Sequence, residues 1–448
     1  MILDTGSSDL YFDASTAPAC ETTGAYSCQG GTFTPGKSSS YQIVEPAPAF
    51  DTRFGDGSTA SGPFAEDTVC IADICITNVQ FGVAQQVKAT TGYSVGLLGL
   101  GYSLNEATRH IYPNIPEVLV AAGEIASRLY SVYLNSIDSS GSILFGGVDV
   151  DKYTGQLVTL DILPDLQVQG VDQFITTVTD FSTNVGGQKT QVWKGGSPGV
   201  DAYKSNDYSL PVLLDTGSSA WSVPTSYYPL IAKQFPYVDN NGLAKCSDVN
   251  PDDTITLTFG GEVDITVPAN EFIVPIYNRT TNAAYEYPSG ADQCVFMIAP
   301  SKGTGMGFDT LGDAILRSMY VVFDLDNAQL SIAQANINST STDVRSVKAG
   351  LNGVASAAKN VQTASIQSFP IAQTINGTAN HQVSTAKTTI GTATGAGAAP
   401  ANAQAGATGT STKTGVASAL TVPKADWSGL WVAVVSLAFV TLGAGVML

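Results

Sequence analysis

An internal repeat constrains the fold of this chain more than any other feature. The segment 2–8 (ILDTGSS) recurs as 213–219 (LLDTGSS), so two aspartates, Asp4 and Asp215, occupy equivalent positions. Each copy is followed at a similar distance by a Leu-Gly pair, which is Leu98-Gly99 in one case and Leu311-Gly312 in the other. Matched motifs at matched offsets predict that residues 1–337 form two lobes built on one plan.

The rest of both halves is typical of β-strands. Short alternating apolar runs are separated by Gly, Pro, Asn or Asp, a pattern typical of all-β folds. Predicted strands include 254–259, 265–267, 320–324 and 329–332. Helical patterns are few and short, with Pro116–Ala122 and Ser226–Gln234 as examples. The sequence therefore predicts an all-β fold with few short helices.

Negative charge is concentrated in the first three quarters of the chain. The 448 residues include 20 basic and 38 acidic side chains, for a net charge of −18. Residues 1–337 have a net charge of −22, whereas residues 338–448 have a net charge of +4. A nucleic-acid-binding protein would normally present a basic face, so no nucleic-acid partner is expected. The change in charge near residue 337 marks a boundary.

The six cysteines indicate disulfide bonds formed in an oxidising compartment. Their spacing favours the sequential pairs, although six cysteines allow 15 connectivities. Only two histidines are present, so neither a structural zinc site nor a Ser-His-Asp mechanism is expected, and we expect no metal and no cofactor. The cysteines are Cys20, Cys28, Cys70, Cys75, Cys246 and Cys294.

The C-terminal quarter differs in composition from the rest. Residues 338–429 are rich in Ser, Thr, Ala and Gly, which predicts a disordered, glycosylated stalk. Residues 430–448 form an uncharged apolar tail preceded by a spacer and small residues at 415–419. This order is typical of a GPI-anchor signal, and a plain membrane helix is the alternative. Predicted N-glycosylation sequons begin at Asn278, Asn338 and Asn376.

The start of the chain lacks the pattern of a secretory leader. The first residues, MILDTG, contain neither a basic segment nor an apolar segment ahead of a cleavage site. Because the cysteines and the C-terminal signal both indicate secretion, we expect that a signal peptide and a propeptide precede this sequence in the full precursor.

Taken together, the repeated motifs resemble those of the pepsin-like aspartic proteases, and the stalk with its anchor signal resembles the fungal, cell-surface, yapsin-like branch. The resemblance covers about residues 1–337. Supporting matches are 54–58 (FGDGS), 96–101 (GLLGLG), 311–313 (LGD) and 323–324 (FD). It implies a bilobal fold with catalytic lobes at 1–160 and 161–337 and a cleft between them. It also implies an aspartic endopeptidase that acts as a monomer on protein or peptide substrates outside the cell.

In such a protease the catalytic residues would be Asp4 and Asp215. Two adjacent carboxyl groups cannot both ionise easily, so they share a proton and act together as general base and general acid on a bound water. The neighbouring residues would support them. Glycine allows close backbone approach, serine can donate a hydroxyl, and threonine would hydrogen-bond across the lobe interface. These supporting residues are Thr5, Gly6, Ser7, Thr216, Gly217 and Ser218.

Residues 50–62 would form a hairpin flap over the cleft, with Phe54, Gly55 and Asp56 near its tip and Tyr11 beneath it. The family usually has tyrosine at the position of Phe54 and tryptophan at that of Tyr11, which leads us to expect a more mobile flap. Asp56 has two interpretations: a solvated turn residue, or a contact for Lys or Arg in the substrate.

Two alternatives to an active surface protease remain. One is a catalytically impaired or truncated wall or binding protein that has kept the fold, and the other is an integral membrane protein with a luminal domain. Both aspartates are present, which favours the active enzyme.

Overall fold

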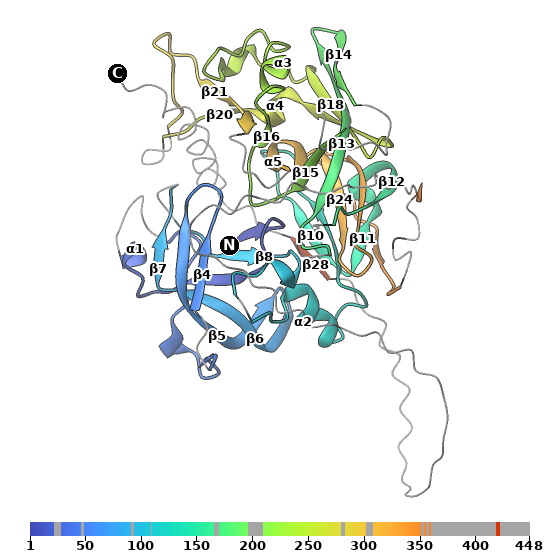
Figure 1. Ribbon diagram of the computed structural model, residues 1–448. Coiled ribbons are helices and arrows are strands. Elements are labelled where there is room, and N and C mark those ends of the chain that lie inside the picture. Colours follow the sequence, from blue (N-terminus) through green and yellow to red (C-terminus); the bar gives the residue numbers. More distant parts are fainter. Residues whose placement is uncertain are drawn as a thin grey trace, which may run out of the picture.

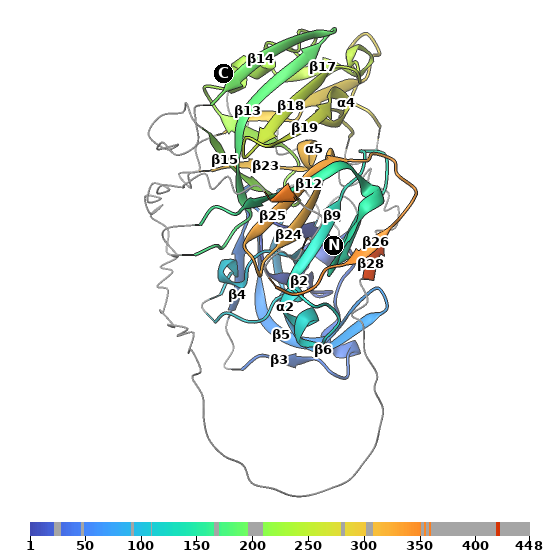
Figure 2. The same cartoon turned by 90° about the vertical axis from the view of Figure 1, so that its right-hand side faces the viewer.

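The computed structural model describes residues 1–21, 28–45, 49–90, 94–108, 110–164, 170–195, 209–278, 283–301, 308–350, 354, 358–359 and 418–421. Strands dominate these residues and form three large sheets. One sheet lies at each end of the molecule, and the third lies between them in both views (Figures 1 and 2). The expected all-β class is confirmed.

The first sheet comes entirely from the start of the chain. The long strands β5 and β6 form its central hairpin, and β1 lies at one edge, parallel to β8. Buried Phe64, Phe81 and Val83 point from this hairpin into the core. Its strands are β1 (Ile2–Asp4), β2 (Leu10–Asp13), β3 (Gln42–Ile43), β4 (Ala49–Arg53), β5 (Thr59–Ile71), β6 (Ile74–Ala84), β7 (Gln86–Lys88) and β8 (Leu97–Gly99).

The sheet at the opposite end repeats the parallel pairing of the first, because β15 lies parallel to β23. The predicted strand 254–259 is β18, with the same bounds. The strands of this sheet are β13 (Ile175–Val185), β14 (Gln188–Lys194), β15 (Leu210–Leu214), β16 (Trp221–Pro224), β18 (Thr254–Phe259), β19 (Val263–Pro268), β22 (Ile298–Ser301) and β23 (Asp309–Leu311). A small sheet beside it contains β17 (Leu243–Lys245), β20 (Ile273–Pro275) and β21 (Gln293–Phe296).

The central sheet joins the two halves of the chain, because β9 pairs with β24 and β12 pairs with β25. Its core is aromatic: the ring centroids of Tyr130 and Phe323 lie 5.0 Å apart, and those of Phe174 and Phe323 lie 4.7 Å apart. The strands are β9 (Leu129–Tyr133), β10 (Ser142–Phe145), β12 (Tyr153–Asp161), β24 (Met319–Asp324), β25 (Gln329–Ala335), β27 (Ala358–Lys359) and β28 (Ser418–Thr421).

The helices are short, as expected. Helix α2 (Ile115–Ala121) begins at a capping box between Asn114 and Glu117 and has proline in its first turn. Helix α5 (Asp313–Leu316) follows directly after β23 and is largely buried. The others are α1 (Pro18–Glu21), α3 (Tyr228–Ala232) and α4 (Ala269–Phe272), together with the 3₁₀ turns η1 (Pro35–Lys37), η2 (Ser103–Asn105), η3 (Val150–Lys152) and η4 (Cys246–Asp248).

The prediction of a disordered stalk from residue 338 onward was wrong for its first residues, and also for β27 and β28, which pair with β12 and β10 in the central sheet. Strand β26 (Val344–Ser346) pairs with β11 (Gly147–Asp149), and Val347 is buried beside them. The Lys152 ammonium donates to the carbonyls of Ser339 and Ser341 at 2.9 Å. Backbone pairing therefore holds this segment although all three side chains of β26 are exposed. Most of the predicted stalk and the whole tail at 430–448 lie outside the described residues.

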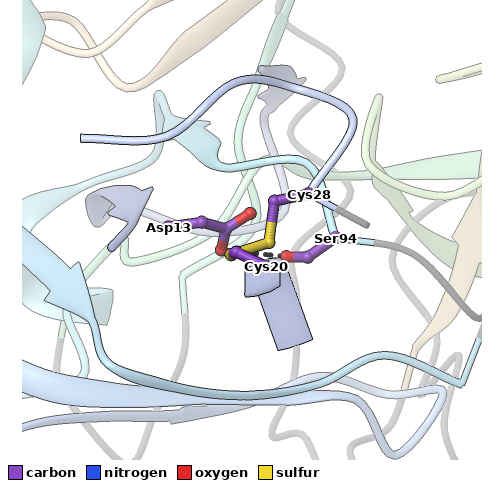
Figure 3. The surroundings of a disulfide bond; sticks show 4 residues. All are labelled: Asp13, Cys20, Cys28 and Ser94. Carbon is purple, nitrogen blue, oxygen red and sulfur yellow. Dashed lines mark hydrogen bonds between the residues drawn. A yellow bond between two sulfur atoms is a disulfide. The ribbon is translucent and has the colours of Figure 1, made fainter. Parts of the chain in front are cut away.

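All three sequential cysteine pairs form disulfides: Cys20–Cys28, Cys70–Cys75 and Cys246–Cys294. Figure 3 shows the first of them beside Asp13, whose carboxylate accepts a hydrogen bond from Ser94 at 2.9 Å. Asp13 and these two sulfurs are the one group of possible metal ligands among the described residues. Both sulfurs are already joined to each other, so the two thiolate ligands are not available.

Candidate active site

The two aspartates occupy equivalent places at the ends of parallel strand pairs. Asp4 lies opposite Gly99 in the β1–β8 pair. Asp215 follows β15, and its amide donates to the carbonyl of Leu311 at 3.1 Å. A Cβ on Gly99 or on Gly312 would come within 2.4 Å of the backbone of the opposing Asp-Thr-Gly-Ser-Ser loop. The repeated Leu-Gly pairs thus lie in or directly after strands β8 and β23, which support the two loops. Glycine lets the backbone at these points approach the loop backbone closely.

The threonines of the two loops hold them together through reciprocal hydrogen bonds. The Thr5 hydroxyl donates to the Leu214 carbonyl at 2.7 Å and accepts from the Thr216 amide at 3.0 Å. The Thr216 hydroxyl donates to the Leu3 carbonyl at 2.7 Å and accepts from the Thr5 amide at 3.1 Å. Each loop therefore satisfies polar groups of the other, which fixes the separation of the aspartates.

The carboxyl groups face each other across the two glycines. A Cβ on Gly6 would lie 2.5 Å from the Asp215 carboxyl carbon, and one on Gly217 would lie 2.5 Å from Asp4 Oδ1. Asp4 accepts hydrogen bonds from the Gly6 amide at 2.8 Å and from the Ser7 hydroxyl at 2.5 Å. Asp215 accepts one from the Gly217 amide at 2.8 Å. Among the described residues no matching bond joins the Ser218 hydroxyl to Asp215, so the pair is asymmetric.

The same asymmetry appears in the electrostatics. Asp4 is buried, and the Asp215 carboxyl is surrounded by protein although part of the residue remains accessible. Burial raises the pKa of Asp215 well above its ordinary value, and the charge of Asp4 and a hydrogen bond to it raise the pKa further. Ionisation of the Asp215 carboxyl beside the Asp4 charge is therefore disfavoured.

Asp313 is a third buried carboxyl near the pair, and the sequence assigned no role to it. Burial raises its pKa to about 7, the Arg317 charge opposes this rise, and the Asp4 charge adds to it. Its amide donates to the Ser218 carbonyl at 2.8 Å. Arg317 is itself paired with buried Glu271 at 2.7 Å. In the sequence, Asp313 directly follows the second Leu-Gly pair, and Arg317 comes four residues later. This spacing was the only indication that the two charges interact.

The predicted flap is the hairpin of β4 and β5. The Phe54 amide donates to the Ser58 carbonyl at 2.9 Å, and Gly57 has a φ of 89°, which favours glycine. Tyr11 is buried beneath the hairpin, with its ring centroid 5.3 Å from that of Phe50 and 6.3 Å from that of Phe54. Burial raises the pKa of Tyr11, and the charges of Asp13, Asp4 and Asp56 add to this rise. The charges of Asp4 and of Asp56 at the flap tip thus both act on the Tyr11 hydroxyl.

The Asp56 side chain is held at the tip of the flap. Its Oδ1 accepts from the Ser58 amide at 2.8 Å, and its Oδ2 accepts from the Ser58 hydroxyl at 2.7 Å. Oδ2 also accepts from the Thr90 hydroxyl at 2.5 Å. Thr90 lies just beyond β7, the strand that pairs with β5 beside the flap. A lone threonine 34 residues away gave no signal in the sequence.

Comparison with known proteins identifies this arrangement. Residues 1–335 match the family model described as "Eukaryotic aspartyl protease". The chain belongs to the eukaryotic aspartyl protease family. The expected enzyme class, an aspartic-type endopeptidase, is thereby confirmed, whereas membership of the yapsin-like branch stays a prediction.

Fungal relatives cover the same region. The chain is 34% identical over 362 residues to "Probable aspartic-type endopeptidase OPSB" of Arthroderma otae, which covers 79% of this chain and 71% of the relative. It is 33% identical to the protein of the same name from Aspergillus fumigatus, over 80% of this chain and 70% of the relative. It is 32% identical to Candidapepsin-4 of Candida albicans, over 77% of this chain and 75% of the relative.

The three predicted glycosylation sites differ in their surroundings. Asn338 is exposed, and its side-chain oxygen accepts hydrogen bonds from Ser136 and Ser139 at 3.2 and 2.7 Å. Asn278 is half-buried beside residues 279–282, which are not described. Asn376 lies outside the described residues. Their glycosylation stays a prediction.

Proposed function

We propose that this protein is an endopeptidase that hydrolyses peptide bonds in proteins at acid pH through the Asp4–Asp215 pair. The observation that carries this proposal is the contact between the two carboxyl groups, together with the raised pKa of Asp215. Such a pair retains one proton in acid solution, so it contains a base and an acid side by side.

The pair performs the hydrolysis in two stages, and each stage has two proton transfers. Asp4, which accepts two hydrogen bonds, removes a proton from a bound water, and the water oxygen attacks the scissile carbonyl carbon. Protonated Asp215 donates its proton to the carbonyl oxygen, which gives a tetrahedral diol. The proton on Asp4 then passes to the amide nitrogen, the C–N bond breaks, and a hydroxyl proton of the diol returns to Asp215. The products are a free amine and a carboxylic acid.

The flap supplies the upper wall of the site. Phe54 presents an aromatic ring beside Tyr11, and Asp56 presents a carboxylate at the tip. We infer that Asp56 contacts a basic side chain of the substrate next to the scissile bond. The net charge of −22 over residues 1–337 supports a preference for cationic substrates.

We further propose an extracellular protein that is attached to the plasma membrane through a GPI anchor. The three disulfides support an oxidising compartment, and the Candida albicans relative named "Secreted aspartic protease 4" supports an extracellular location. Among the described residues, no helix has the length and apolar character needed to cross a membrane. The anchor proposal rests on the sequence at 415–448. Mass spectrometry of surface-extracted protein tests it, because replacement of the tail by an anchor removes every peptide from 430–448.

Substitution of either catalytic aspartate tests the activity itself. Asp4→Asn and Asp215→Asn should each reduce turnover of a peptide substrate to near background, because half of the pair cannot carry out both transfers. Asp73→Asn is a matched control, since Asp73 is exposed in the turn between β5 and β6. Retention of more than a few per cent of the activity in either catalytic variant contradicts the proposal.

A further inference from the structure

The hydrogen bonds around Asp56 fix its carboxylate and leave one of its acceptor sites open. A carboxylate has about four sites that can accept hydrogen bonds. In the described part of the chain three are taken, one on Oδ1 by the Ser58 amide and two on Oδ2 by the hydroxyls of Ser58 and Thr90. The remaining site lies on Oδ1, and Asp56 is only half-buried. A donor from outside the protein can therefore reach it.

Thr90 makes this arrangement rigid because it contacts three residues of the tip. Its hydroxyl bonds Asp56 at 2.5 Å and lies 3.1 Å from the Ser58 hydroxyl. Its amide donates to the same Ser58 oxygen at 3.1 Å. A Cβ on Gly57 would lie 4.0 Å from the Thr90 methyl group, which therefore packs beside the tip. The contacts join the flap to the chain beyond β7, so Asp56 is held from two sides.

The fixed carboxylate lies on the flap side of the site and the catalytic pair lies on the other. Tyr11 is buried beneath the flap, with its ring centroid 6.3 Å from that of Phe54. A substrate residue next to the scissile bond must pass between the flap and the pair. A long basic side chain can place one N–H donor on the free site of Oδ1, whereas an apolar side chain of equal length cannot.

We propose that Thr90 is a specificity-determining positioning residue, which orients the Asp56 carboxylate toward a Lys or Arg side chain beside the scissile bond. The inference rests on the proposed function and adds the residue that controls this preference. Without the Thr90 hydroxyl the carboxylate can rotate, and the basic side chain must then order it during binding. A carboxylate that Thr90 already holds in place avoids the entropy that would be lost when the substrate orders it.

Two peptides that differ at one position test the proposal. One carries Lys before the scissile bond and the other carries norleucine, which has a similar length and no charge. The measured quantity is the ratio of their kcat/KM values. We expect Thr90→Val to lower this ratio by about threefold to tenfold through KM of the Lys peptide, with the norleucine peptide changed by less than about twofold. Thr90→Ser keeps the hydroxyl and should restore most of the ratio.

The controls separate orientation from general damage to the flap. Asp56→Asn should bring the ratio close to one, and addition of Thr90→Val to it should lower the ratio no further. Thr68→Val alters an exposed threonine farther along β5 and should leave the ratio unchanged. If Thr90→Val leaves the ratio unchanged, whether both kcat/KM values fall equally or neither falls, the proposal is overturned.

Failure of the proposed function has a different signature. If the unmodified protein cuts neither peptide, the endopeptidase assignment fails, and binding of the same peptides with a reduced scissile bond provides an independent measurement. Tighter binding of the Lys peptide that is lost in Thr90→Val supports the inference. Equal binding of the two peptides to the unmodified protein overturns it.

Discussion

Glu106 is a buried carboxyl that makes the fold sensitive to pH. Its Oε2 accepts from the Tyr112 amide at 3.0 Å, while Oε1 has no hydrogen-bond partner among the described residues. Burial raises its pKa from the ordinary 4.5 to about 9, the hydrogen bond from Tyr112 opposes the rise, and the charges of Asp9 and Glu117 add to it. The folded protein therefore holds a proton on Glu106 that the unfolded chain releases at much lower pH.

This difference predicts a loss of stability as the pH rises. The contribution of Glu106 is fully present below about pH 4.5 and is lost progressively toward pH 9, because the unfolded state binds fewer protons in this range. Glu106→Gln keeps the shape and the acceptor but cannot ionise. We expect its melting temperature to fall less than that of the unmodified protein between about pH 5 and pH 8, by at least ~4 °C. Calorimetry across this range measures the difference.

The matched control is Glu262→Gln, which alters an exposed carboxyl in the turn between β18 and β19. Its melting temperature should follow that of the unmodified protein at every pH. The prediction for Glu106 is wrong if both variants have the same pH dependence. The sequence could not reveal this group, since an isolated glutamate in a loop has no pattern that indicates burial.

At the residue scale, the aspartate pair of the proposed mechanism is visible in the sequence, but the residues around it that are distant along the chain are not. Asp4 and Asp215 were found because a repeated motif is visible without coordinates. Thr90 and Glu271 act through contacts with residues that are distant along the chain, 34 positions in one case and 46 in the other. Such contacts arise from strand pairing and side-chain packing, which a single sequence does not encode in any local pattern.

At the scale of elements, the flap lacks a hydrogen bond that is usual in the family, as the sequence already indicated. Phe54 has no hydroxyl, so the bond from a flap tyrosine to a tryptophan cannot form. Apolar contact of Tyr11 with Phe50 and Phe54 and the hydrogen bonds of Asp56 with Ser58 and Thr90 connect the flap to the lobe instead.

The double substitution Phe54→Tyr with Tyr11→Trp should raise kcat/KM by more than the two single changes combined. A neutral hydrogen bond contributes about 0.5–1.5 kcal/mol, which corresponds to roughly two- to tenfold in rate if it forms only in the transition state. Tyr11→Trp alone should lower the stability by about 1–3 kcal/mol, because Tyr11 is buried against Phe50. A double-mutant cycle in kcat/KM measures the coupling, and additive single effects would show that the two side chains act independently.

Prediction of the elements succeeded where the side-chain pattern alone decides the structure. Residues 254–259 alternate polar and apolar side chains, and β18 has these bounds because every second residue is buried. Residues 344–346 are all exposed and have no such pattern, yet they form β26. Pairing with the backbone of β11 stabilises them, and composition contains no information on such pairing.

At the scale of the whole molecule, the acidic charge should attract cationic substrates over a longer range than Asp56 does. Residues 1–337 have a net charge of −22, which raises the local concentration of a positive peptide. The Debye length falls from about 30 Å at 0.01 M salt to about 3 Å at 1 M. We therefore expect kcat/KM for a Lys-rich peptide to fall severalfold over this range at about pH 6, whereas that of a neutral peptide stays nearly constant.

The same effect should fade in more acid solution and should not depend on the flap. Ordinary Asp and Glu side chains titrate near pH 4, so the salt dependence should be weak at about pH 3. Asp56→Asn removes one charge of many, so this variant should lose the preference for Lys beside the scissile bond and keep the salt dependence. Loss of both together in Asp56→Asn would mean that a single local contact, rather than the charge of the whole region, attracts basic substrates.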